Sequence, residues 1–306
     1  MKFKKYLEFK QYIWSNYQPY AQELSPIEEG YKTGTNWAKR NAPRFFRALQ
    51  VIDSLITEAN FTLIDVGAYP GSFSRLAKAS FGESITEIHA CGMTPDEDFK
   101  KLLATEEINF FPCNLDPDIQ SPFNIPVGLP LADNSVDCIV LMEVVEHLYS
   151  LKTIMLECYR VLKPNGICYI TTNNISDRVG LLRLLCKNST NLDEDLEQTS
   201  IWSDYKNTWR GHVRFFSLNQ LCEVGMKSGF KIERASYFQH YEDPDVYIHK
   251  EEANIFSRIL RNKLKGDGSR PPLWLKMYAQ SIWHLGIKSL SISYSSHIEI
   301  VYRKPS

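Results

Sequence analysis

The chain has 306 residues, of which 43% are hydrophobic and 12% aromatic, and its formal net charge is -1 at pH 7. A chain of this length buries enough apolar surface to fold without disulfides or a structural metal, and its near-neutral charge argues against a general nucleic-acid binder. The seven cysteines occur singly, without a C-x-x-C pair, which favours reduced core thiols in a cytoplasmic protein.

Residues 1–60 are expected to form an N-terminal helical region. Aromatic and aliphatic side chains recur there at helical spacing, as in Tyr6, Phe9 and Ile13, and such a stripe is typical of packing. The region also carries three basic residues that either bind an anionic acceptor or form a solvated face: Lys39, Arg40 and Arg44. The start of the chain shows no apolar core of a secretion signal, and no segment has the apolar length of a membrane span.

Residues 61–239 alternate short apolar runs with amphipathic helices, which is typical of a parallel sheet with crossover helices. The clearest helix covers residues 150–162, and further helices are expected over 179–186 and 217–228. The expected strands cover residues 61–66, 87–93, 109–113, 137–142, 166–172 and 230–237, and residues 291–306 return to this region with a last strand over 297–302.

Residues 240–290 interrupt the pattern before the last strand, and we expect a helical insertion there. From residue 255 onward it is rich in Lys and Arg and holds Trp274, Tyr278 and Trp283. Cationic side chains beside such aromatic rings favour contact with anionic lipid, and a plain surface lid is the alternative. The expected location is therefore cytoplasmic, either free or in peripheral contact with the inner face of the membrane.

The sharpest local signal is a glycine-rich turn. An apolar strand ends in Asp65 and runs through Gly67 and Gly71 into a helix near Ser72. Glycines let a backbone approach a ligand closely, and a helix start presents free N–H groups, so the turn predicts a ligand site at the carboxyl edge of the sheet. A dinucleotide site would require G-x-G-x-x-G and an acidic residue about twenty positions later, and neither is present.

Taken with the segments 129–148, 157–166 and 169–174, the stretch Asp65-Val-Gly-Ala-Tyr-Pro-Gly71 closely resembles the class I S-adenosylmethionine (SAM)-dependent methyltransferases. The resemblance covers about residues 61–237 and the last strand. It implies an α/β, Rossmann-like fold with a seven-stranded sheet and an antiparallel terminal hairpin. It also implies a transferase that binds SAM over the first two strands.

The same resemblance implies the cofactor-binding residues. Its first motif falls on Asp65, Gly67 and Gly71, with Ala68 and Tyr69 inside the turn and Tyr69 where a second glycine is common. The family's ribose-binding acidic position is Thr94 here, so either Thr94 or Asp96 serves, or ribose binding is unusual. Two further positions are implied, Asn114 where the family has an adenine-contacting Asp, and Met142 at the end of the fourth strand.

A second cluster carries the groups that can act on the acceptor. Glu143, Glu146 and His147 stand at i, i+3 and i+4, so a helix that begins there would project all three toward one side. With His212, the E-x-x-E-H pattern resembles methyltransferases of the terminal 2'-hydroxyl of small RNAs, which implies that the four residues bind a divalent ion. Ubiquinone-pathway O-methyltransferases share Glu-Val-x-Glu-His. Carboxylates with imidazoles suit Mg, Mn or Zn, and without a metal His147 would be the general base.

These features predict an enzyme that methylates a hydroxyl of a sugar, glycan precursor or similar polyol-bearing metabolite, with residues 1–60 on the acceptor side. The alternatives are a terminal RNA hydroxyl, which the missing positive charge disfavours, and a prenylated quinone-like acceptor. A protein of another class, a non-catalytic binding or scaffold module with the methyltransferase fold, is also left open.

Overall fold

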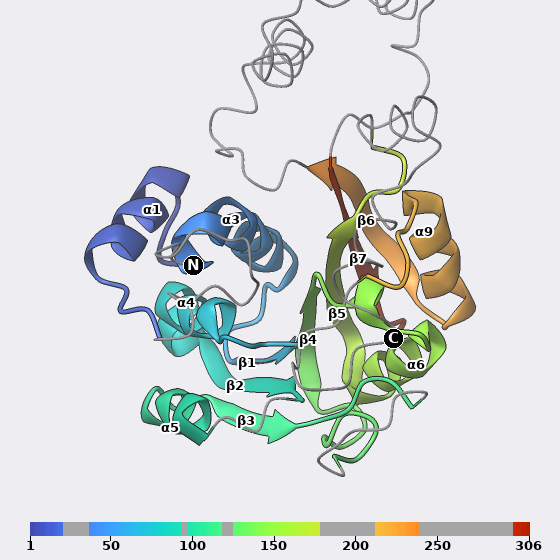
Figure 1. The fold of residues 1–306 in the computed structure, drawn as a ribbon, viewed down its shortest axis with the longest axis horizontal. Coiled ribbons are helices and arrows are strands. Elements are labelled where there is room, and N and C mark those ends of the chain that lie inside the picture. The colour runs from blue at the N-terminus through green and yellow to red at the C-terminus, as the bar shows by residue number, and fades with distance from the viewer. Residues whose placement is uncertain (21–36, 94–96, 118–124, 178–211, 239–295) are drawn as a thin grey trace, which may run out of the picture.

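The computed structural model describes residues 1–20, 37–93, 97–117, 125–177, 212–238 and 296–306. Its centre is a seven-stranded sheet with the strand order β3-β2-β1-β4-β5-β7-β6 (Figure 1). Neighbouring strands from β3 to β5 are parallel, and β7 runs antiparallel to both β5 and β6. The strands are β1 (Phe61–Val66), β2 (Ile85–Gly92), β3 (Asn109–Pro112), β4 (Val136–Met142), β5 (Leu162–Asn173), β6 (Lys231–Phe238) and β7 (His297–Arg303).

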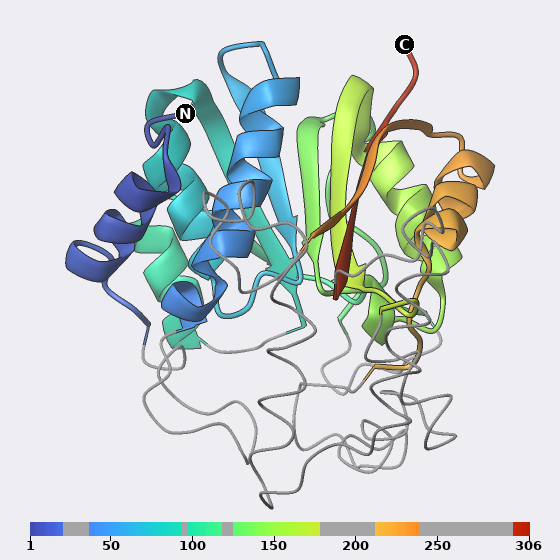
Figure 2. The same ribbon diagram turned by 90° about the horizontal axis from the view of Figure 1, so that it is seen from above.

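Helices cover both faces of the sheet, as Figure 2 shows. One face carries α1, α3, α4 and α5, and the other carries α6 and α9. Successive side chains of each strand therefore point into two different cores. In β1, for example, Leu63 belongs to the core under α3 and Ile64 to the core under α6. The helices are α1 (Tyr6–Ser15), α3 (Trp37–Leu55), α4 (Ser72–Phe81), α5 (Glu97–Thr105), α6 (Leu151–Val161) and α9 (Leu218–Lys227).

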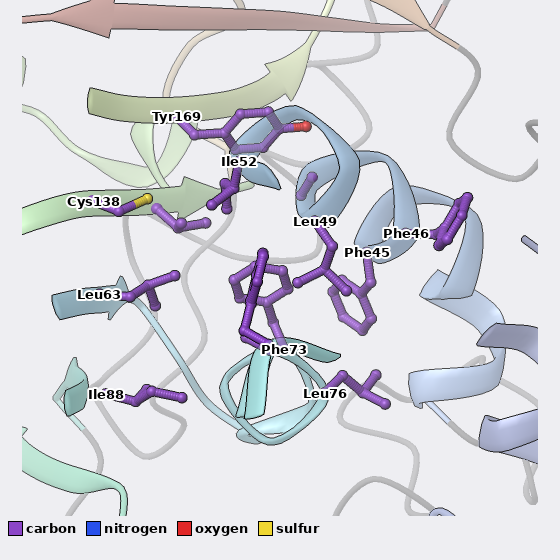
Figure 3. Packing of buried hydrophobic residues seen from close by; sticks show 14 of the residues in the cluster. Phe45, Phe46, Leu49, Ile52, Leu63, Phe73, Leu76, Ile88, Cys138 and Tyr169 are labelled. Atoms are coloured by element: carbon purple, nitrogen blue, oxygen red, sulfur yellow. The ribbon is translucent and has the colours of Figure 1, made fainter. Parts of the chain in front are cut away.

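The aromatic stripe of the N-terminal helices is packing. Phe9 of α1 lies 5.5 Å from Phe46 of α3, and Phe45 lies 5.7 Å from Phe73 of α4, both measured between ring centroids. Figure 3 shows Phe45, Phe46 and Phe73 together with strand residues of the same core, among them Leu63 and Cys138. Arg44, on the same helix, is only 4% exposed, so the solvated-face alternative is wrong for this residue.

A buried ion-pair network fastens α3 to the antiparallel end of the sheet. The carboxylate of Glu299, on β7, is fully buried and accepts hydrogen bonds from Arg47 Nε at 2.8 Å and from Tyr169 Oη at 2.9 Å. Its other oxygen accepts from Arg234 Nε at 2.8 Å and from Ser236 Oγ at 2.9 Å. Burial alone would raise the pKa of Glu299, but the two arginines and Ser236 outweigh that effect and lower it.

The expected strands and helices that the structure describes agree with it to within about two residues, with two exceptions. The helix expected to begin at Glu143 is wrong: Val145–His147 form a single 3-10 turn, and α6 begins only at Leu151. Strand β5 also begins four residues earlier than expected, directly where α6 ends. The helix at 179–186, the insertion at 240–290 and its basic aromatic part lie outside the described residues. No helix among the described residues is both long and apolar enough to cross a bilayer.

Candidate active site

The glycine-rich turn joins the end of β1 to α4 at the carboxyl edge of the sheet. Gly67 and Gly71 have φ angles of 75° and 86°, in the region that favours glycine. The amides of Gly67 and Ala68 donate to the carbonyl of Cys91 at 2.9 and 3.1 Å, which fixes the turn to β2. A Cβ added to Gly67 would lie 2.6 Å from Cγ2 of Val144. Both conformation and space therefore require glycine at position 67.

Asp65 fixes the start of α4 to the end of β1. Its side chain is buried and accepts hydrogen bonds from the hydroxyl of Ser74, at 2.6 Å, and from the Ser74 backbone. Burial raises the pKa of Asp65 to about 7, although these bonds and the charge of Arg44 pull it down. The observed role of Asp65 is thus to shape the turn, and its direct contact with a cofactor stays a prediction.

The backbone at the start of α4 favours a negatively charged group. Gly71, the N-cap residue of α4, has no side chain that could cap the helix start, and the dipole of the helix favours a negative group at this end. A carboxylate on the ligand would be accommodated there. SAM carries such a carboxylate next to its amino group.

Asn114 shapes the loop that follows β3. Its side-chain oxygen accepts a hydrogen bond from the backbone amide of Asp116 at 3.1 Å. Its backbone amide donates to the Pro126 carbonyl at 3.0 Å. The Asp116 carboxylate in turn accepts from the amides of Tyr149 and Ser150, just before α6. Sequence reasoning missed Asp116, which connects this loop to the loop of the polar cluster. Contact between Asn114 and adenine stays a prediction.

The other predicted cofactor residues also lie at this edge where they are described. The ring of Tyr69 packs edge-on against Phe99, with 5.2 Å between ring centroids. Met142 is the last residue of β4 and is partly buried against the core under α3. Thr94 and Asp96, the two candidates for ribose binding, lie outside the described residues.

Glu146, His147 and His212 come together beside the turn that follows β4. One possible ligand atom from each residue lies within 4.8 Å of the others, and the two imidazole rings are 4.8 Å apart between centroids. The Glu146 carboxylate is fully buried and accepts from Thr172 Oγ1 at 2.8 Å. The amide of Val213 donates to the Glu146 carbonyl at 2.9 Å, which holds the segment of His212 in place.

The electrostatics of this group disfavour an isolated negative charge on Glu146. Burial raises the pKa of Glu146 well above its usual range, and the nearby Glu143 charge raises it further, whereas the Thr172 bond and Arg44 act in the opposite direction. A positive ion next to Glu146 would offset the cost of burying its carboxylate. One carboxylate and two imidazoles are a mixed oxygen and nitrogen donor set that suits Zn or Mn, and less strongly Mg.

Glu143 lies outside this three-residue group. Its carboxylate accepts from Thr171 Oγ1 at 2.9 Å and is paired with Arg44 Nη1 at 3.4 Å and His297 Nε2 at 3.2 Å. Because consecutive residues of a strand point to opposite faces, Thr171 holds Glu143 on the α3 side of the sheet, while the Thr172 bond to Glu146 lies on the α6 side. The expected projection of Glu143, Glu146 and His147 toward one side is therefore wrong.

Sequence reasoning also missed His297, because only the topology reveals it. His297 is the first residue of β7, and since β7 is antiparallel to β5, it lies at the edge where the parallel strands end. Its position in the chain, 154 residues after Glu143, carries no motif spacing. The roles of Thr171 and Thr172 were readable from the sequence. Two consecutive polar residues near the end of a strand supply one side chain to each face of the sheet, here one to Glu143 and one to Glu146.

Part of the sequence is similar to known proteins. Residues 64–170 match a family model described as a methyltransferase domain. A probable SAM-dependent methyltransferase of Mycolicibacterium smegmatis is 46% identical over 46 residues, a match that spans 15% of this chain and 18% of that protein.

Two solved structures share the fold. Phosphoethanolamine N-methyltransferase 2 of Haemonchus contortus in complex with SAM aligns with a TM-score of 0.53 and 15% identity, over 97% of this chain and 60% of that one. A SAM-dependent methyltransferase of Archaeoglobus fulgidus aligns with a TM-score of 0.50 and 17% identity, over 85% of this chain and 93% of that one. The two structures share the fold of this chain, and the match to the methyltransferase model lies within the sheet that carries the glycine-rich turn.

Proposed function

We propose that this chain is an O-methyltransferase that transfers the methyl group of SAM to a hydroxyl of a sugar, glycan precursor or similar polyol-bearing metabolite, with the help of a divalent cation. The observation that supports this most is the convergence of Glu146, His147 and His212 at the same sheet edge as the glycine-rich turn. Residues 1–60 would cover the acceptor.

The residues of the chain would divide the work between donor and acceptor. When bound, SAM supplies an electrophilic methyl group on a sulfonium. The turn from Gly67 to Gly71 would hold its methionine end, and Glu146, His147 and His212 would hold a cation that lowers the pKa of a coordinated hydroxyl. As the new O–C bond forms and the S–C bond breaks, the hydroxyl loses its proton to water or to a nearby base. Without a cation, His147 would accept that proton.

A cation held by three protein groups keeps coordination positions for two neighbouring hydroxyls, which supports a polyol acceptor. A terminal RNA ribose offers the same pair of hydroxyls, but the net charge of -1 gives the chain no overall attraction for the phosphate backbone. A prenylated quinone-like phenol would also meet the base at His147. These acceptors are the comparison arms of the test.

The test begins with calorimetric titration of the chain with SAM, followed by assays with sugars, glycan precursors, a short RNA and a quinone-type phenol. S-adenosylhomocysteine formation is measured by mass spectrometry. We expect SAM binding, turnover with a polyol, loss of turnover in excess EDTA and its return with Mn or Zn. Undiminished turnover in EDTA would remove the cation and leave His147 as the base. Failure to bind SAM would instead support the non-catalytic scaffold.

A further inference from the structure

The outer side of α1 exposes large apolar side chains. Tyr6, Phe9 and Ile13 turn inward and are buried, whereas Leu7 and Trp14 are 59% and 47% exposed. Residues seven positions apart lie two turns apart on the same side of a helix, so Leu7 and Trp14 share this outer side. Figures 1 and 2 show α1 outermost on its face of the sheet, with α3 and α4 between it and the strands.

Two lysines flank the exposed indole of Trp14. The distance from Nζ to the centroid of the Trp14 ring is 5.6 Å for Lys10, on α1, and 5.3 Å for Lys39, on α3. Lys10 also lies one turn after Leu7, on the same side of α1. Ammonium groups at this distance are attracted to the face of the indole, so charge and apolar surface stay together. Leu7, Lys10, Trp14 and Lys39 are called the α1 patch below.

The segment that carries most of this patch is basic. Residues 1–20 contain four lysines and one acidic residue, Glu8. The Glu8 carboxylate accepts hydrogen bonds from the backbone amides of Lys4 and Lys5 at 3.0 and 3.3 Å, so its charge lies at the start of α1. The net charge of the whole chain is only -1, so the positive charge here is a local feature. It would complement a negatively charged partner.

The end of α1 that holds Trp14 leads to the edge of the sheet with the glycine-rich turn. Tyr20 follows the last residue of α1 by five positions, and its ring centroid lies 6.1 Å from that of Phe99. Phe99 in turn lies 5.2 Å from Tyr69, inside the turn, measured the same way. A partner seated on the α1 patch would therefore lie on the side of the molecule that carries this edge.

We propose that the α1 patch is a peripheral membrane-binding surface that recognises anionic phospholipid. Trp14 and Leu7 would enter the headgroup region, where an amphipathic ring is favoured, and Lys10 and Lys39 would pair with lipid phosphates. The patch is separate from the basic segment after residue 255, which lies outside the described residues. The inference goes beyond methyl transfer, because it needs neither SAM nor a cation.

The test is co-sedimentation of the full chain with vesicles of phosphatidylcholine, either alone or with about a third of the lipid replaced by phosphatidylglycerol. We expect binding to the anionic vesicles only, and weaker binding at high salt. Lys10→Gln combined with Lys39→Gln should lower the partition coefficient about twentyfold, because each lysine near an anionic surface contributes about fivefold. Leu7→Ser combined with Trp14→Ser should lower it at least about tenfold.

The matched control is Met226→Ser combined with Lys227→Gln. It removes an apolar side chain that is 57% exposed and an exposed lysine from α9, on the opposite face of the sheet, so vesicle binding should stay at the wild-type level. Circular dichroism checks that every variant folds. A further variant replaces Arg258, Arg261 and Lys263 by glutamine, and wild-type binding of this variant would support the α1 patch.

Three results would overturn the inference. The first is equal binding of the wild-type chain to both kinds of vesicle, or binding to neither. The second is loss of binding in the variant of the segment after residue 255 while both α1 variants bind like wild type. The third is a dimer in analytical ultracentrifugation that Leu7→Ser with Trp14→Ser abolishes without weakening vesicle binding, because a second copy would then cover the patch.

Discussion

Replacing Gly67 by alanine tests whether the turn after β1 has room only for glycine. The added Cβ would lie 2.6 Å from Cγ2 of Val144 and must move to about 3.4 Å, where ordinary contact begins. Overpacking of this kind costs about 1–3 kcal/mol, and the φ angle of 75° adds about 1 kcal/mol. We therefore expect urea unfolding to show a loss of about 2–4 kcal/mol, and calorimetry to show SAM binding weakened at least about tenfold.

Two variants separate the clash from the backbone strain. Gly82 also has a positive φ, 55°, but an added Cβ would meet nothing within 4 Å, so Gly82→Ala carries backbone strain of about 1–3 kcal/mol without a clash and should leave SAM affinity unchanged. Adding Val144→Ala to Gly67→Ala should restore part of the lost SAM affinity, because it removes the two methyl groups nearest the new Cβ. If Gly67→Ala is as mild as Gly82→Ala in both assays, the close approach between the turn and Val144 is wrong.

Three further predictions concern buried carboxylates. Glu299→Gln should lower the unfolding free energy by about 3 kcal/mol at pH 7. Because the folded-state pKa of Glu299 is lowered, urea melts should show the difference between wild type and variant shrinking as the pH falls below about 4. A difference that stays constant with pH would contradict this prediction. The pKa of Asp65 is raised from 3.8 to about 7, so the folded chain favours the protonated carboxyl. The contribution of protonated Asp65 to the free energy of unfolding is therefore fully present below pH 4 and is lost as the pH rises to 7. Asp65→Asn should therefore flatten the stability of the chain between pH 4 and 7, and melts that keep the wild-type slope would count against the buried position of Asp65. Thr172→Val should weaken Mn²⁺ binding about tenfold in calorimetry, because it removes the hydroxyl that Glu146 accepts from, whereas Thr171→Val, the matched control beside Glu143, should not weaken it.

Most of the fold was predictable from the sequence because local patterns determine it. Apolar runs bounded by polar turns marked β1 and β4, and the apolar face of α6 with its Lys163-Pro-Asn-Gly stop marked that helix within one residue at each end. The start of β5 was missed because Lys163 and Pro164 look like loop residues, although the chain is already extended there beside β4. Tertiary pairing decided this boundary against local propensity.

The site was only partly predictable, for a related reason. Motif order placed Gly67, Glu146 and His212 at one edge of the sheet, and the structure describes them there. Helical spacing placed Glu143 with them, but the turn after β4 is 3-10 and its first residue is left-handed, so the i, i+3, i+4 rule does not apply. Arg44 and His297 meet Glu143 only because α3 and the antiparallel β7 fold onto the same edge, and no spacing in the chain encodes that meeting.

A crystal of the chain grown with S-adenosylhomocysteine and Mn²⁺, measured for anomalous scattering at the manganese edge, tests the central claim most directly. The account predicts the nucleoside product lying along the turn from Gly67 to Gly71 and one manganese peak among Glu146, His147 and His212. A product bound elsewhere, or an anomalous map without a peak in that group while the product is in place, would contradict it.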